Sequence, residues 1–214
     1  MSDKVELNDD ISLSGIYNKT ISEIPDKDSY IASYSAIIFA AKLLVDSENC
    51  TTAQAIAHMV YGWMPTIPKS VCSSAFKHCP LGKIQNSNDI DEVLSSFQKS
   101  PINGSWIGFS KFLHFINPKL FPIWDRNVAF CFGVKGHSQI NNMDRYRQYA
   151  KWIESMKDHE DVLRMQEKYK EKYGYRISKT RALEFMLFHY GKKQRLDKKM
   201  DPVEVSSKID DETP

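Results

Sequence analysis

Apolar residues in this chain recur at the spacing of helices, and no segment shows the alternation that is typical of strands. The clearest case lies between Tyr30 and Asp46, where the apolar positions fall on one stripe of a helix. The members of this stripe are Tyr34, Ile37, Ile38, Ala41, Leu44 and Val45. Because no alternating segment is found elsewhere, the sequence predicts an all-α protein.

Helical segments separated by proline and glycine predict about eight helices in two groups, and therefore a two-lobed bundle with a cleft between the lobes. Residues 1–27 mix polar and apolar positions and predict an N-terminal arm that packs on the body. Residues 28–193 form the helical domain, in which Ser178 is expected to cap the last helix and Gly191 to end it. Residues 194–214 are charged, lack aromatic side chains and predict a disordered tail.

The composition is that of an ordinary soluble globular protein, with 42% hydrophobic and 26% charged residues. No run approaches the roughly 18 to 20 apolar residues of a membrane helix, and the first residues do not resemble a signal peptide. The four cysteines are irregularly spaced, so we expect reduced thiols. We expect no bound metal and no cofactor. We therefore expect a cytoplasmic monomer that does not associate with membranes.

One segment, Trp106–Val128, reads as an apolar helix, a turn, and a second helix that begins after an acidic residue. Pro118 ends the first helix because the residue before a proline is pushed out of the α region. Phe121–Trp124 is then a short apolar link. Asp125 follows it, where it would cap the next helix, and this structural role could be its whole purpose.

The segment also resembles the catalytic region of the helix-hairpin-helix DNA glycosylase superfamily, which includes enzymes of the 8-oxoguanine glycosylase and endonuclease III types. Members of this superfamily present an essential aspartate at a helix N-terminus after a Val/Phe-Pro-Val-Asp sequence. Here Phe121-Pro122-Ile123-Trp124-Asp125 matches with one residue inserted, and the resemblance covers about residues 101–132.

This resemblance implies an enzyme that binds double-stranded DNA, flips out a damaged or modified base and excises it, leaving an abasic site. Asp125 would stabilise the positive charge that develops on the sugar. It is the only carboxylate between Glu92 and Asp144. The resemblance implies no cofactor.

A lysine after the hairpin marks the members of the superfamily that also cleave the DNA strand. Their hairpins usually read Gly-x-Gly, whereas this chain has the looser spacing of Gly104 and Gly108. Aligned without gaps from Asp125, the lysine position falls near Ser105, which leaves a site that works through the aspartate alone. If the segment is shortened, Lys111 takes the place of that lysine. Otherwise it is an ordinary exposed helical lysine.

Aromatic and basic residues supply the other candidates. Trp106, His114 and Trp124 could line a base pocket, although aromatic side chains at such spacings also build cores. Five residues could bind DNA through backbone amides or positive charge: Gly104, Gly108, Arg126, Lys179 and Arg181. Basic residues are in excess over residues 164–199, which indicates either a phosphate-binding stripe or a solvated helix face.

Two other functions remain open from the sequence. A non-catalytic helical module could bind DNA or a protein partner, with Asp125 acting only as a cap. A metal-dependent nuclease is disfavoured because no pair of acidic residues at ligand spacing has a lysine nearby.

Overall fold

In the computed structural model, the described residues are 5–8, 10–26, 28–46, 51–64 and 67–200, with only the backbone described for 198–200. Every regular element in these ranges is a helix, apart from one isolated bridge between Val71 and Ile102, so the predicted all-α class is confirmed. The described ranges contain more helices than the eight expected, because several are only four to six residues long. The elements are α1 (Leu13–Ile21), α2 (Ser29–Asp46), α3 (Thr52–Gly62), the 3-10 helix η1 (Ser73–Lys77), α4 (Leu81–Asn86), α5 (Ile90–Leu94), α6 (Trp106–Ile116), α7 (Arg126–Phe130), α8 (His137–Ile140), α9 (Met143–Met156), α10 (Glu160–Tyr173) and α11 (Lys179–Met200).

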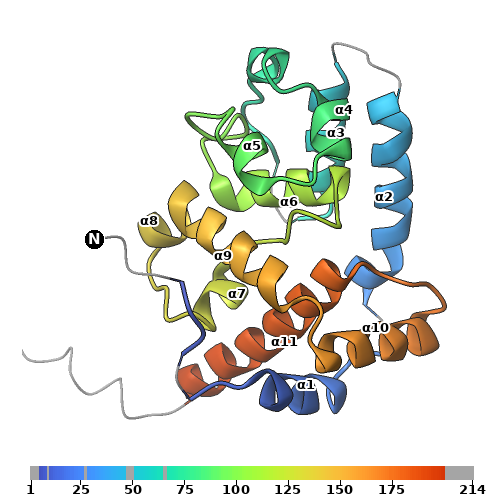
Figure 1. Ribbon diagram of the computed structural model, residues 1–214, viewed down its shortest axis with the longest axis vertical. Coiled ribbons are helices and arrows are strands. Elements are labelled where there is room, and N and C mark those ends of the chain that lie inside the picture. The colour runs from blue at the N-terminus through green and yellow to red at the C-terminus, as the bar shows by residue number, and fades with distance from the viewer. Residues whose placement is uncertain (1–4, 9, 27, 47–50, 65–66, 201–214) are drawn as a thin grey trace, which may run out of the picture.

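The helices form two groups, which correspond to the upper and lower halves of Figure 1. In the first group, α2, α3, α4 and α6 pack against one another. In the second group, α11 lies at the centre and contacts α1, α7, α9 and α10. The main helix contacts between the groups are those of α9 with α5 and α6. A bundle of two helical groups is therefore the architecture of this chain.

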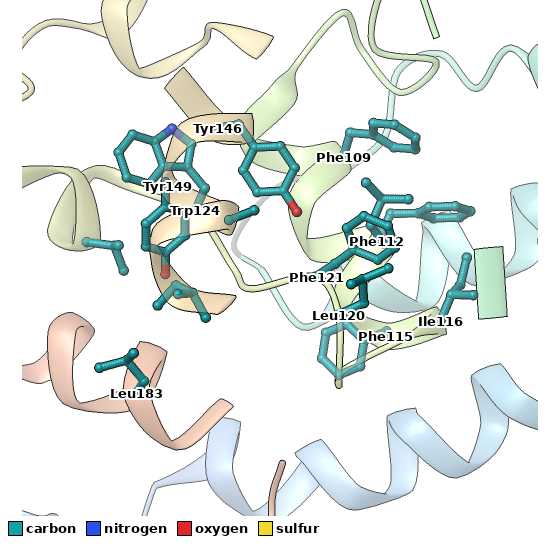
Figure 2. Close-up of a cluster of buried hydrophobic side chains, with 14 of the residues drawn as sticks. Phe109, Phe112, Phe115, Ile116, Leu120, Phe121, Trp124, Tyr146, Tyr149 and Leu183 are labelled. Carbon is teal, nitrogen blue, oxygen red and sulfur yellow. The ribbon is translucent and has the colours of Figure 1, made fainter. Parts of the chain in front are cut away.

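The buried core runs from one group to the other through the link between α6 and α7. Figure 2 shows Phe109 and Phe112 on α6, Phe121 and Trp124 on the link, and Tyr149 on α9. The rings of Trp124 and Tyr149 have centroids 4.8 Å apart. The segment that delivers Asp125 is therefore part of the core rather than a surface loop.

The N-terminal segment belongs to the second group. Its helix α1 contacts α10 and α11, and Val5 is buried. Ser14 Oγ donates a hydrogen bond of 2.7 Å to Asp161 Oδ2, and Thr20 Oγ1 donates one of 3.3 Å to Met186 O. What the sequence describes as an arm is thus a helix that packs along the body.

Helix α2 is long and apolar enough to cross a membrane, judged by its length and composition alone, although the sequence analysis expected no such segment. It packs against α3 and α6, and its residues Tyr34, Ala41 and Val45 are buried. Only 22% of the helix is buried, however, and the apolar side chains of Phe39 and Leu43 are exposed.

The sequence predicts that Gly191 ends the last helix. This prediction is wrong, because α11 continues to Met200. A Cβ atom at Gly191 would lie 2.0 Å from the backbone oxygen of Asn127, at the place where α11 packs on α7. The glycine is therefore needed for close helix packing rather than for a C-cap. Residues 194–200, assigned to the tail, are helical, while 201–214 lie outside the described residues.

Replacing Gly191 with Ala is expected to lower the free energy of unfolding by about 2 to 3 kcal/mol, because the added methyl group collides with backbone. Urea denaturation measures this loss. The matched control is Gly82→Ala in α4, where no described residue outside the local helix backbone lies within 4 Å of the new methyl group. That substitution should stabilise the protein by up to about 1 kcal/mol. Equal stabilities of the two variants would contradict the packing role.

Candidate active site

The link Phe121–Trp124 is held through all four of its carbonyl groups. Each lies within hydrogen-bond distance of a buried side chain: Phe121 O with His114 Nδ1 (2.7 Å), Pro122 O with Tyr146 Oη (3.2 Å), Ile123 O with Tyr149 Oη (3.1 Å) and Trp124 O with Ser110 Oγ (3.2 Å). Ser110 Oγ also accepts a hydrogen bond of 3.1 Å from Trp124 N. Leaving a buried backbone carbonyl or amide group unpaired costs free energy. These hydrogen bonds therefore fix the path of the link and the position of Asp125.

Asp125 caps α7, as the sequence predicts. Its Oδ1 accepts hydrogen bonds from Asn127 N (2.8 Å) and Val128 N (3.0 Å). Within the described part of the chain, Oδ2 has no hydrogen-bond partner, and the half-buried side chain lines a pocket. The two interpretations of Asp125 are therefore compatible, because one oxygen serves the cap and the other is left for a ligand.

This central pocket has a volume of about 330 Å³ and lies between the two helix groups. It is walled by the beginning of α2, the end of α3, the middle of α6, the link and one face of α11. The lining residues are Asp28, Tyr30, Ile31, Trp63, Met64, Lys111, Ile123, Asp125, Arg181, Glu184, Phe185, Phe188, His189 and Lys192. Its volume is within the range of small-ligand sites, and its walls combine aromatic rings with several charges.

Lys111 lines the central pocket together with Asp125 and is half-buried. Burial lowers the pKa of its amine, Asp125 and Glu184 oppose this shift, and Arg181 adds to it. Among the described residues, no carboxylate forms an ion pair with Lys111. A less basic amine without a paired acid is closer to the neutral form that acts as a nucleophile.

Arg181 is buried rather than exposed to a DNA backbone, which corrects its expected role. Its Nη1 donates to Glu184 Oε2, and both side chains line the central pocket with 6% and 1% of their surface exposed. The guanidinium lies over the ring of Tyr34, 5.0 Å from its centroid, and Nε has no hydrogen-bond partner among the residues that the structure describes. Burial raises the pKa of Glu184, and Arg181 beside it lowers it. Glu184 was not among the site residues predicted from the sequence. It could have been found there, because it stands three residues after Arg181 among the apolar residues of one helix.

Trp106 and Trp124 are core residues and do not line the central pocket, so their expected role in a base pocket is corrected. Trp124 is fully buried and its Nε1 donates a hydrogen bond of 2.8 Å to Ile140 O. Trp106 packs edge-on against Phe109, with centroids 5.7 Å apart. The aromatic side chains that line the central pocket are instead Tyr30, Trp63, Phe185, Phe188 and His189.

His114 is also outside the central pocket and has a structural role. Its Nδ1 donates to Phe121 O, because a carbonyl can only accept, so Nε2 accepts from the hydroxyl of Tyr34 at 2.8 Å. This pattern requires the neutral ring, and burial lowers the pKa of His114 to about 3. The ring therefore joins α2, α6 and the link.

Acid is expected to destabilise the fold through His114. Between its unfolded pKa of about 6.5 and its folded pKa of about 3, the unfolded chain binds a proton that the folded chain does not. The free energy of unfolding should thus fall by roughly 3 kcal/mol from pH 7 to pH 4.5, and His114→Asn should remove this part of the pH dependence. Glu184 acts in the opposite direction and His189 in the same one, so urea titrations must compare the variant with the wild type. Parallel pH profiles would contradict this role.

Only some amides of the turn before α6 remain free for a phosphate, since among the described residues Gly104 N has no hydrogen-bond partner whereas Trp106 N and Gly108 N do. Gly104 is left-handed, with φ of 61°, which suits a turn. Trp106 N donates to Asn141 Oδ1 (2.7 Å) and Gly108 N to Ser105 Oγ (3.1 Å), so both amides are satisfied within the chain.

Gly108 instead allows α6 to approach α3. A Cβ atom at this position would lie 1.9 Å from Tyr61 Oη. Its expected contact with DNA is therefore replaced by a packing role.

The expected basic stripe is largely neutralised by acidic partners. The ion pairs along it are Arg164–Asp161, Lys168–Glu171, Lys172–Asp26, Arg176–Glu167, Lys179–Asp158 and Lys193–Glu23. Lys179 is half-buried and pairs with Asp158, whereas Arg126 is exposed and forms no ion pair with the described residues. The stripe thus behaves mainly as a solvated helix face.

In the described ranges, no cluster of side chains is arranged for metal binding or for thiol chemistry. No group of three or more His, Cys, Asp or Glu side chains there could hold a metal ion. Cys72, Cys79 and Cys131 are free thiols, and Cys50 lies outside the described residues.

Comparison with family models, with curated proteins and with solved structures finds no match to this chain.

Proposed function

We propose that this chain is a DNA N-glycosylase that turns a modified nucleotide out of the duplex and cleaves its glycosidic bond in the central pocket. The observation that carries the proposal is the meeting of Asp125, Lys111 and several aromatic side chains in one pocket between two helical groups. The resemblance of the segment around Asp125 to helix-hairpin-helix glycosylases leads to the same activity.

Asp125 would act on the charge that develops during the reaction. As the glycosidic bond breaks, the sugar becomes positively charged, and a fixed carboxylate in a site with little water stabilises it better than solvent does. The bonded link and the two amides at Oδ1 hold the carboxylate before the substrate arrives. Little energy is then spent on reorganising the site during the reaction.

The aromatic wall would hold the everted base. Turning a nucleotide out of the stack costs a few kcal/mol, and stacking on aromatic rings contributes about 1 to 3 kcal/mol for each base. Tyr30 and Trp63 lie on one side of the central pocket and Phe185 and Phe188 come from α11. These rings can offset the cost of eversion.

Lys111 would supply a nucleophile, which favours the shortened alignment over the site with aspartate alone. Its Nζ lone pair forms a bond to C1′ while the C1′–base bond breaks, and the base leaves with that bond's electron pair and takes up a proton. The Lys111 nitrogen then loses a proton, and its lone pair forms a C=N bond to C1′ while the C1′–O4′ bond breaks. O4′ keeps that bond's electron pair and takes up a proton, which leaves an iminium ion between Lys111 and the ring-opened sugar. The lowered pKa of the amine supports this role.

A panel of duplexes, each with one oxidised, alkylated or deaminated base, tests the activity. We expect incubation followed by alkali to break the strand at the modified position in at least one duplex, because alkali cleaves abasic sites. Absence of any base release across the panel would count against the proposal.

A second candidate is a helical module that binds DNA or a protein partner without catalysis. The observation that favours it is the cap, since Asp125 Oδ1 already has a complete role at the start of α7. The two candidates predict different effects of Asp125→Asn: the glycosylase should lose base release, whereas the binding module should keep its binding.

A further inference from the structure

A second hollow of about 260 Å³ lies beside the link, between α7, α8 and the end of α11. Its lining residues are Arg126, Phe130, Val134, Lys135, Gly136, His137, Ile140 and Arg195. Three of these, Arg126, Lys135 and Arg195, are positively charged, a fourth is a histidine and none is acidic, so we refer to it as the basic hollow. Cations grouped around one hollow attract anions more strongly than isolated surface charges do.

The charges of the basic hollow lack counter-charges within the described part of the protein. None of Arg126, Lys135, His137 and Arg195 forms an ion pair there, unlike the basic residues of α10. Arg195 Nη1 donates a hydrogen bond of 2.6 Å to Asn127 Oδ1, which is a neutral acceptor and leaves the positive charge uncompensated. Cations held together in this way repel one another unless an anion lies between them.

The basic hollow and the central pocket are lined by nearby residues of the same two segments. Arg126 directly follows Asp125, and Arg195 lies three residues after Lys192 on α11, which places both on the same face of that helix. Lys192 lines the central pocket, so one face of α11 contributes a basic side chain to each hollow.

We propose that the basic hollow binds backbone phosphates of the DNA strand whose nucleotide enters the central pocket. Guanidinium groups match the geometry of phosphate oxygens, and duplex DNA offers a phosphate on each strand at every 3.4 Å. The choice of DNA as the ligand rests on the proposed function. The contact itself requires only a strand of phosphates and no modified base.

The test compares two double variants that remove the same charge. R126Q/K135Q changes two exposed residues of the basic hollow, and K168Q/R176Q changes two exposed residues that are paired with acids. Fluorescence anisotropy with an unmodified duplex over a salt series gives the dissociation constant and its salt dependence. For R126Q/K135Q we expect at least tenfold weaker binding at about 0.1 M salt, with the slope of log K against log salt smaller in magnitude by about 2. K168Q/R176Q should stay within about twofold of the wild type.

Wild-type affinity of R126Q/K135Q, or an equal loss in both variants, would overturn the proposal. It would also be overturned if the wild type bound anionic phospholipid vesicles through these residues and did not bind DNA. Unmodified DNA requires no turnover, so the result is independent of catalysis. If R126Q/K135Q loses DNA binding and no base is ever released, the phosphate contact stands and the glycosylase proposal fails.

Discussion

Replacing Asp125 with Asn is expected to slow base release at least a hundredfold while the protein stays folded. Asparagine keeps the shape of the side chain and caps helices as well as aspartate does, so stability should change by less than about 1 kcal/mol. It removes the negative charge that would oppose the sugar cation, and losing one such stabilising group typically costs about 10² to 10³ in rate. Single-turnover assays with alkali cleavage measure the rate, and urea denaturation measures the stability.

Asp89→Asn is the matched control for this variant. Asp89 caps α5 in the same way, with Oδ1 accepting from Asp91 N (2.8 Å) and Glu92 N (3.2 Å), but it does not line the central pocket. The control should release base at the wild-type rate. If Asp125→Asn does so as well, the cap is the whole role of Asp125 and the non-catalytic module is the better interpretation.

Borohydride should trap a covalent complex between the protein and a duplex that contains its substrate base. The reagent reduces the iminium ion to a stable amine, so trapping reports the attack of an amine on C1′. Lys111→Gln is expected to reduce trapping more than a hundredfold, whereas Lys192→Gln, in the same pocket, should retain it. Gel electrophoresis under denaturing conditions separates the complex from free DNA.

Two outcomes would contradict the role of Lys111. If Lys111→Gln is trapped as well as the wild type, the nucleophilic amine lies elsewhere. If the wild type releases base without any trapped complex, the site works through Asp125 alone, as the alignment without gaps implies.

Local features of the fold could be predicted from the sequence because they depend on neighbouring residues. Asp125 and Ser178 cap the helices that follow them, as the sequence predicts. Helix periodicity and capping act within about one turn, so a single sequence contains the information.

The composition of the central pocket could not be predicted in the same way. Tyr30, Trp63 and Glu184 come from α2, from the residue after α3 and from α11, and only tertiary packing brings them to Asp125. From the sequence, aromatic residues near the link, such as Trp124, could equally line a pocket or belong to the core. Trp124 is fully buried and belongs to the core. The role of Gly191 could not be predicted either, because glycine occurs both where two helices pack closely and where a helix ends.

Binding of a sugar-cation mimic tests the central claim most directly, because it does not depend on which base is excised. The measurement compares the dissociation constants of two duplexes, one with a positively charged pyrrolidine in place of a nucleotide's sugar and one with a neutral tetrahydrofuran. If Asp125 stabilises a developing sugar cation, the wild type should bind the charged duplex at least tenfold more tightly, and Asp125→Asn should lose this preference. Equal affinities of the wild type for the two duplexes would contradict the account.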